Sequence, residues 1–120
     1  MTCTDGPVPA PSFLVAVTDQ LVGIDIAAIL RDAHPDAVVV TAPDREAALI
    51  LLKDGPAPKL AVVSLSPQEA VSSPLGQALR ALGARIVLMG HEAELHGEAD
   101  GFEVLHRPFR TIDLLALIGR

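Results

Sequence analysis

The hydrophobic positions of this chain form short apolar runs that are separated by amphipathic segments. Residues 60–65, with the sequence LAVVSL, form the most informative run, because it is nearly all apolar and does not alternate with polar positions. Strands that are buried on both faces of a sheet have this pattern. Prolines on both sides of the run limit its length. We therefore predict a central parallel strand that presents Ser64 at its carboxyl end.

The rest of the pattern predicts four more strands and the helices between them. The strands are expected at residues 13–17, 37–41, 84–89 and 102–106. Helices are expected at residues 20–33, 45–53, 75–82 and 112–118, with a weak helix at 91–100 and a looser segment at 67–74. Strand and helix alternate five times in this interpretation, which favours an α/β fold with a parallel sheet and helices on both faces.

The expected topology is a flavodoxin-like, doubly wound sheet of five parallel strands in three layers, with the strand order 2-1-3-4-5. This domain would span residues 13–120, and residues 1–12, which have no periodic pattern, would be a tail or linker. The order places the first and third strands side by side. Thr18, Asp19 and Ser64 would then share one crevice at the carboxyl edge of the sheet.

The apolar residues of the first and last helices predict which side of each helix is buried and which is exposed. The apolar face of the first helix is expected to be Leu21, Ile24 and Ala28, with Leu30 near its end. Asp19, directly before this helix, is expected to be its N-cap rather than a metal ligand, because aspartate is a preferred cap residue. The last helix has apolar residues at 112, 114, 115, 117 and 118, more than one buried face needs. It either forms a dimer surface or packs deeply.

Composition excludes several classes of function. The formal charge is −6 and the basic residues are scattered, which disfavours direct nucleic-acid binding. One cysteine in 120 residues allows no internal disulfide, and no apolar run is long enough to span a membrane. The sequence has no Trp or Tyr to stack on a cofactor ring, so we expect no cofactor. We expect a cytoplasmic protein of one domain.

Residues near the end of the chain carry a resemblance to a known family. Arg107-Pro108-Phe109, followed by the helix at 112–118, closely resembles the Lys-Pro-Phe motif and final helix of the receiver domains of bacterial two-component response regulators. Residues 83–89 resemble the loop and fourth strand of that family, and the architecture matches over residues 13–120. In that family, an aspartate at the end of the third strand accepts the phosphoryl group, and an acidic pair follows the first strand.

The chain departs from the family in this pocket. Ser64 occupies the position of the phosphoacceptor, and Thr18-Asp19 stands where the acidic pair would be, so that one carboxylate is missing. Phosphoryl transfer needs a carboxylate nucleophile, and Mg²⁺ usually needs carboxylate ligands. The resemblance therefore implies a degenerate receiver in which Ser64 is not phosphorylated and no metal is bound, with Asp19 the one candidate ligand.

Three further positions differ from the family's switch residues. Met89 matches the switch Thr or Ser, Val104 matches the switch aromatic residue, and Arg107 matches the lysine. Phe102 is an alternative match to the aromatic residue if the fifth strand carries a small insertion. A pairing of Arg107 with Asp19 is one hypothesis for the counter-charge in the crevice.

The predicted function is a phosphorylation-independent signalling and interaction module without enzymatic activity. Its partner would be a protein such as a histidine kinase, a response regulator or an output domain, with a homodimer through the last helix as one arrangement. An alternative is a domain that senses a small molecule or an anion on the same fold. The chain could also be one domain of a larger kinase or regulator. His91, Glu94 and His96 match no standard metal site and are interpreted as solvated helix residues.

Overall fold

The computed structural model describes residues 12–55 and 57–118, and residues 1–11 of the predicted tail lie outside the described residues. Five parallel strands form one sheet in the order β2-β1-β3-β4-β5, which confirms the predicted fold class and topology. The strands are β1 (Ser12–Ala16), β2 (Val38–Thr41), β3 (Leu60–Val63), β4 (Arg85–Leu88) and β5 (Glu103–Val104). Each lies within the predicted run or begins one residue before it.

Helices connect the strands, and two of them differ from the prediction. The helical elements are α1 (Gln20–Ala33), α2 (Arg45–Asp54), α3 (Pro67–Ser72), α4 (Pro74–Ala81), the π-helical turn η2 (Ala93–Gly97) and α5 (Thr111–Ile118). The looser segment predicted at residues 67–74 is in fact helix α3 and the start of α4. The weak helix predicted at residues 91–100 is present but shorter: residues 91–92 are helical and lead directly into the π-helical turn η2, and residues 98–100 form a turn.

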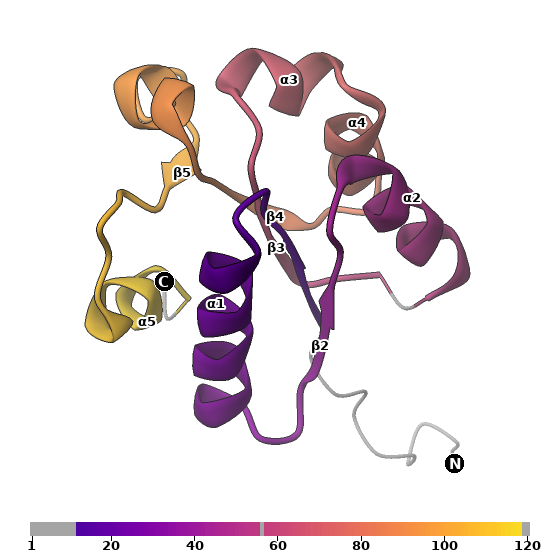
Figure 1. Cartoon of the computed structure of the whole chain (residues 1–120). Coiled ribbons are helices and arrows are strands. Elements are labelled where there is room, and N and C mark those ends of the chain that lie inside the picture. The colour runs from indigo at the N-terminus through magenta and orange to yellow at the C-terminus, as the bar shows by residue number, and fades with distance from the viewer. Residues whose placement is uncertain (1–11, 56, 119–120) are drawn as a thin grey trace, which may run out of the picture.

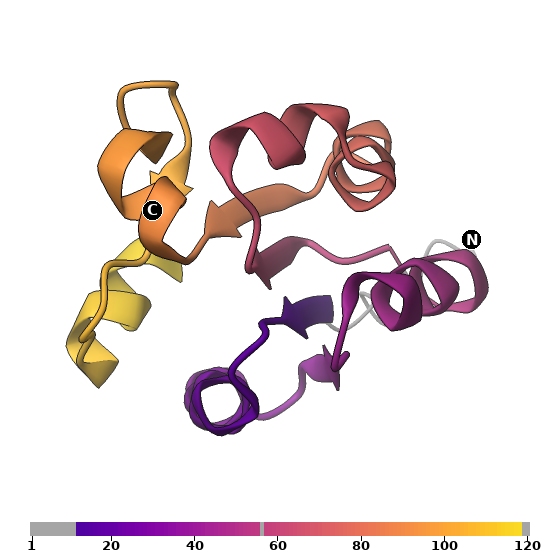
Figure 2. The same cartoon turned by 45° about the horizontal axis from the view of Figure 1, so that its top comes forward.

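The sheet lies between two helical layers (Figure 1). Helices α1 and α5 cover one face, and α2, α3 and α4 cover the other, as the turned view also shows (Figure 2). Neighbouring residues of the buried strands point to opposite layers: Phe13 and Val15 pack in the cluster under α1 and α5, whereas Leu14 and Ala16 pack in the cluster under α2 to α4. This arrangement explains why the strand runs lack polar alternation.

The predicted apolar face of α1 is correct for Leu30 but wrong for Leu21, Ile24 and Ala28, which are exposed. Leu21 is 76% exposed and Ile24 is 62% exposed, whereas Ile26 and Leu30 are fully buried. A Cβ atom at Gly23 would lie 3.0 Å from Val17 Cγ2, so the helix lies close to the sheet at this glycine. The helix therefore has two apolar stripes, and the hydrophobic period alone does not tell which stripe faces the core.

Helix α3 begins with a capping box that the sequence analysis missed. Ser66 Oγ accepts the Glu69 N–H at 3.1 Å, and Glu69 Oε1 accepts the Ser66 N–H at 3.0 Å. Pro67 occupies the first turn, where its missing N–H costs no helical hydrogen bond. Serine followed three residues later by glutamate is a start signal that was visible in the sequence.

Candidate functional site

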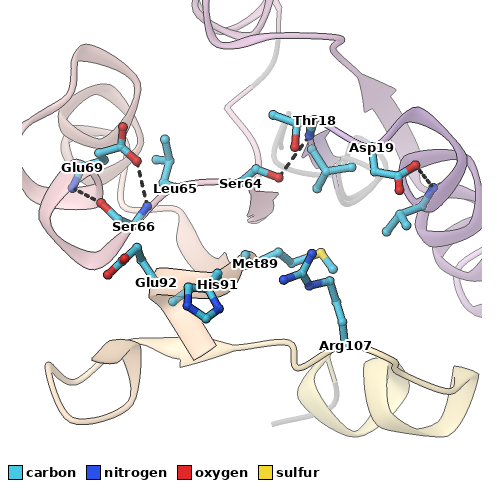
Figure 3. Close-up of a pocket in the computed structure, with 14 residues that line it drawn as sticks. Thr18, Asp19, Ser64, Leu65, Ser66, Glu69, Met89, His91, Glu92 and Arg107 are labelled. Carbon is cyan, nitrogen blue, oxygen red and sulfur yellow. Dashed lines mark hydrogen bonds between the residues drawn. The ribbon is translucent and has the colours of Figure 1, made fainter. Parts of the chain in front are cut away.

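The adjacent ends of β1 and β3 position the central polar pair of the candidate site. Ala16 is in register with Val63, so the residues that follow the two strands leave the sheet side by side. The Ser64 N–H donates to Ala16 O at 3.0 Å, which extends the ladder by one bond. In return, Ser64 Oγ accepts the Thr18 N–H at 3.1 Å (Figure 3). The Ser64 hydroxyl therefore holds the loop that leads into α1.

A cavity of about 270 Å³ lies at this edge of the sheet. Its lining includes most of the residues that the sequence analysis placed there, namely Thr18, Asp19, Ser64, Met89 and Arg107. Val104 is not among them, because its side chain is 5% exposed and packs in the core cluster on the α2 side. The lining also includes four polar residues that were not predicted as part of the site: Ser66, Glu69, His91 and Glu92.

Asp19 is the N-cap of α1, as predicted. One of its carboxylate oxygens, Oδ1, accepts the N–H groups of Leu21 at 3.0 Å and of Val22 at 3.3 Å. These bonds satisfy two amides that the helix itself leaves without partners. Part of the carboxylate's acceptor capacity is therefore committed to the helix.

Arg107 pairs with Glu94, not with Asp19 as one hypothesis had it. The backbone N–H and the Nε of Arg107 both donate to Glu94 Oε2 at 2.9 Å, and Nη2 lies 3.5 Å from Glu94 Oε1. This contact joins the turn η2 to the loop before α5. The interpretation of Glu94 as a solvated residue was therefore wrong; its side chain is only 20% exposed.

The pair shifts the ionisation of both partners. Hydrogen bonds from the Arg107 side chain and backbone hold the pKa of Glu94 below its usual value. The Glu94 carboxylate in turn raises the pKa of Arg107, and Asp19 adds a smaller effect in the same direction. The two partners are 13 positions apart in the sequence. No local spacing rule covers such a pair, so only the fold reveals it.

Met89 occupies the floor of the site. It is 4% exposed and packs in the core cluster under α1 and α5, while part of it borders the cavity. A thioether is at most a weak hydrogen-bond acceptor and has no donor. This side of the cavity is thus apolar, and Arg107 enters from the loop after β5 (Figure 3).

Glu69, the acidic residue on the α3 side of the cavity, already has two partners, the Ser66 N–H and Arg45. The Ser66 backbone N–H is the main cause that lowers the pKa of Glu69, and Arg45 of α2, 2.7 Å away, lowers it further. On the protein surface, Glu92 Oε2 lies 3.9 Å from His96 Nε2. Within residues 12–55 and 57–118, no group of three or more His, Cys, Asp or Glu side chains is arranged to hold a metal ion.

Comparison with solved structures shows that the chain has a receiver-like fold. The chemotaxis response regulator CheY4 of Vibrio cholerae matches with a TM-score of 0.70 and 17% identity, over 93% of this chain and 98% of that one. SdrG from Sphingomonas melonis Fr1 matches with a TM-score of 0.70 and 18% identity, over 92% of this chain and 94% of that one. No protein-family model and no curated protein matches the sequence.

No helix in the described part of the chain has the length and apolar character that a membrane span requires.

Proposed function

We propose that this chain is a signalling interaction module that binds a protein partner without phosphoryl transfer. The observation that carries the proposal is the bond from the Thr18 N–H to Ser64 Oγ, at the edge where a receiver would present its phosphoacceptor. A serine hydroxyl needs an adjacent base to become a good nucleophile. Among the described residues, no histidine or carboxylate side chain is hydrogen-bonded to Ser64 Oγ.

The charges around Ser64 support the same proposal. Asp19 caps α1 and Glu69 completes the capping box of α3, so both carboxylates already accept backbone N–H bonds. Mg²⁺ needs oxygen ligands in near-octahedral geometry, usually including free carboxylates. Arg107, at the position of the family's lysine, is held by Glu94. These bonds occupy part of the hydrogen-bonding capacity of the charged groups nearest Ser64, which supports a site without a metal or a phosphoryl group.

Two exposed apolar surfaces are the proposed contacts with partners. On α5, Ile112 is 62% exposed and Leu115 is 39% exposed, which suits the homodimer expected through this helix. A groove of about 690 Å³ runs between α1 and the loop before α5. Its lining combines apolar side chains with Asp25, Asp32 and the paired Glu94 and Arg107, so its formal charge is negative. A helix of a histidine kinase, response regulator or output domain with apolar and basic residues would complement this groove.

Incubation with acetyl phosphate and Mg²⁺, followed by intact-mass spectrometry, tests the absence of phosphoryl transfer. We expect no added phosphoryl mass, whereas a receiver domain with an aspartate at this position serves as the positive control. The variant Ser64→Ala is the matched control of this chain. An adduct that forms on the natural protein and is lost in Ser64→Ala would contradict the proposal.

The proposed homodimer through α5 is tested by a separate measurement. The variant Leu115→Glu places a charge in the centre of the exposed α5 surface and should abolish a dimer that forms there, as read by light scattering across a range of protein concentrations. The matched control Leu95→Glu changes an apolar side chain of η2 that is 58% exposed, away from α5. Equal effects of the two variants would count against an α5 interface.

A small anionic ligand is the second candidate function, and the cavity itself favours it. Arg107, His91 and Ser64 all line the space of about 270 Å³ and could donate to an anion. Dose-dependent stabilisation by such a ligand in a thermal-shift screen, lost in Arg107→Gln, would support sensing. No stabilisation across the screen would leave the protein-interaction module as the better account.

A further inference from the structure

The outer edge of β2 is the strongest feature that the proposed function does not use. β2 is the terminal strand of the sheet and pairs with β1. The Ala42 N–H donates to Val15 O at 2.9 Å, so the backbone groups of Ala42 and Val40 point toward β1. Because successive residues of a strand point their backbone groups to opposite sides, those of Val39 and Thr41 point away from the sheet.

Arg31 covers this edge in part. Its Nη2 donates to Val39 O, one of the outward carbonyls, at 3.2 Å. Arg31 lies in the last turn of α1 and its side chain reaches back across the strand that follows. A charged side chain placed over an edge strand is a common way to prevent one sheet from pairing with another. The strand itself is suited to pairing, since its sequence is VVVT and Val38 is 45% exposed.

We propose that the β2 edge is a self-association surface for a second copy of this chain and that Arg31 keeps it closed. The edge is self-complementary in the antiparallel direction. With a twofold axis at Val40, Val39 of one copy faces Thr41 of the other, and each outward N–H meets an outward carbonyl. Four backbone hydrogen bonds then join the two sheets, and both Arg31 side chains must leave Val39 O.

This inference is independent of the proposed function, because it concerns the edge of the sheet that is farthest from β5 and involves no residue of the candidate site. Each chain carries a formal charge of −6, which also opposes association. Removing Arg31 increases the negative charge further. An increase in association after its removal therefore reflects the opened edge and not reduced repulsion.

Analytical ultracentrifugation of Arg31→Ala over a concentration series tests the proposal. We expect the dimer association constant to rise about tenfold over the natural protein, since one weak side-chain bond is released on each copy. The second change Thr41→Pro removes an outward N–H without touching the ladder to β1, and it should reverse the rise. An unchanged association constant in Arg31→Ala would overturn the proposal.

Two further measurements keep the result specific. Arg80→Ala removes the same charge from an exposed position on α4 and should leave association unchanged; a rise equal to that of Arg31→Ala would overturn the proposal. Amide hydrogen exchange then locates the interface without a proline variant. In the Arg31→Ala dimer, the Val39 and Thr41 amides should exchange more slowly as protein concentration increases. Fast exchange of both amides in the dimer would also overturn it.

Discussion

The two crossovers on either side of β4 connect neighbouring parallel strands in different ways. The crossover from β3 to β4 consists of α3 and α4, which bury Ala70, Leu75 and Leu79 against the sheet. The crossover from β4 to β5 contains only the turn η2, which buries Ala93 and Gly97 and leaves Leu95 exposed. Side-chain packing holds the first crossover, and the second has much less apolar area to bury.

Two charged pairs help to hold the second crossover in place. Glu94 binds Arg107, and Glu98 Oε1 lies 2.9 Å from His106 Nε2, so the turn is tied to the segment after β5 at two points. Exposed ion pairs contribute little stability, whereas buried leucines contribute several kcal/mol. The candidate site borders both crossovers: Ser66 and Glu69 line it from the first, and His91 and Glu92 line it from the second, which is the less firmly held one.

The largest expected effect is loss of packing in the first crossover. Leu79→Ala removes a fully buried side chain of α4 and should lower the free energy of unfolding by about 2–5 kcal/mol, measured by urea denaturation. Leu95→Ala in η2 is the matched control and should change it by less than about 0.5 kcal/mol. Similar losses in the two variants would show that the crossovers do not differ in packing.

A smaller loss is expected where η2 meets β5. A Cβ atom at Gly97 would lie 2.5 Å from Val104 Cγ2, so Gly97→Ala should destabilise the protein by about 1–3 kcal/mol through overpacking. The same change in a Val104→Ala background should cost less, because the obstructing methyl group is gone. A double-mutant cycle measures this coupling, and additive effects would contradict the close contact.

The smallest expected effect comes from the ion pair. Glu94→Gln should lower the urea midpoint at pH 7 by less than either packing variant. The folded-state pKa of Glu94 is below the ordinary 4.5, so the carboxylate stabilises the protein above that value, and this contribution is lost as pH falls through the lowered pKa. The difference between Glu94→Gln and the natural protein should therefore shrink on acidification.

Glu92→Gln provides the control for this pH dependence. Glu92 directly precedes η2. Its Oε2 lies 3.9 Å from His96 Nε2, and its side chain makes no contact with Arg107. We expect a weaker effect at pH 7 than that of Glu94→Gln. If the two variants behave alike, general charge and not the Arg107 contact governs the crossover.

The fold could be predicted from the sequence because its signals are local and repeated. Apolar runs such as residues 60–65 recur between helical segments, and this alternation fixes a parallel sheet with few topologies. The capping function of Asp19 was also predictable, since a cap acts on the next two or three residues. Helix α3 was missed although Ser66, Pro67 and Glu69 provided its start signal.

The predictions that were wrong concern contacts between residues that are distant in the sequence and adjacent only in the folded protein. Leu21 and Ile24 have helical spacing, but so do Ile26 and Leu30, and of these only Leu30 was predicted to be buried and is buried; the position of the sheet decides which stripe faces the core. Asp19 was the expected partner of Arg107, and Glu94 could be recognised as the partner only once the position of η2 was known. Sequence patterns therefore located the candidate site but did not reveal how its charges are paired.

The Thr18 amide is the best-placed probe of the proposal that the site at the ends of β1 and β3 does not take up a phosphoryl group. Its N–H donates to Ser64 Oγ, so its NMR resonance reports on any group that occupies the site. Beryllofluoride with Mg²⁺, a mimic of a bound phosphoryl group, should leave the Thr18, Ser64 and Met89 amide resonances in place. Saturable shifts of these three resonances, together with an intact-mass adduct from acetyl phosphate, would contradict it.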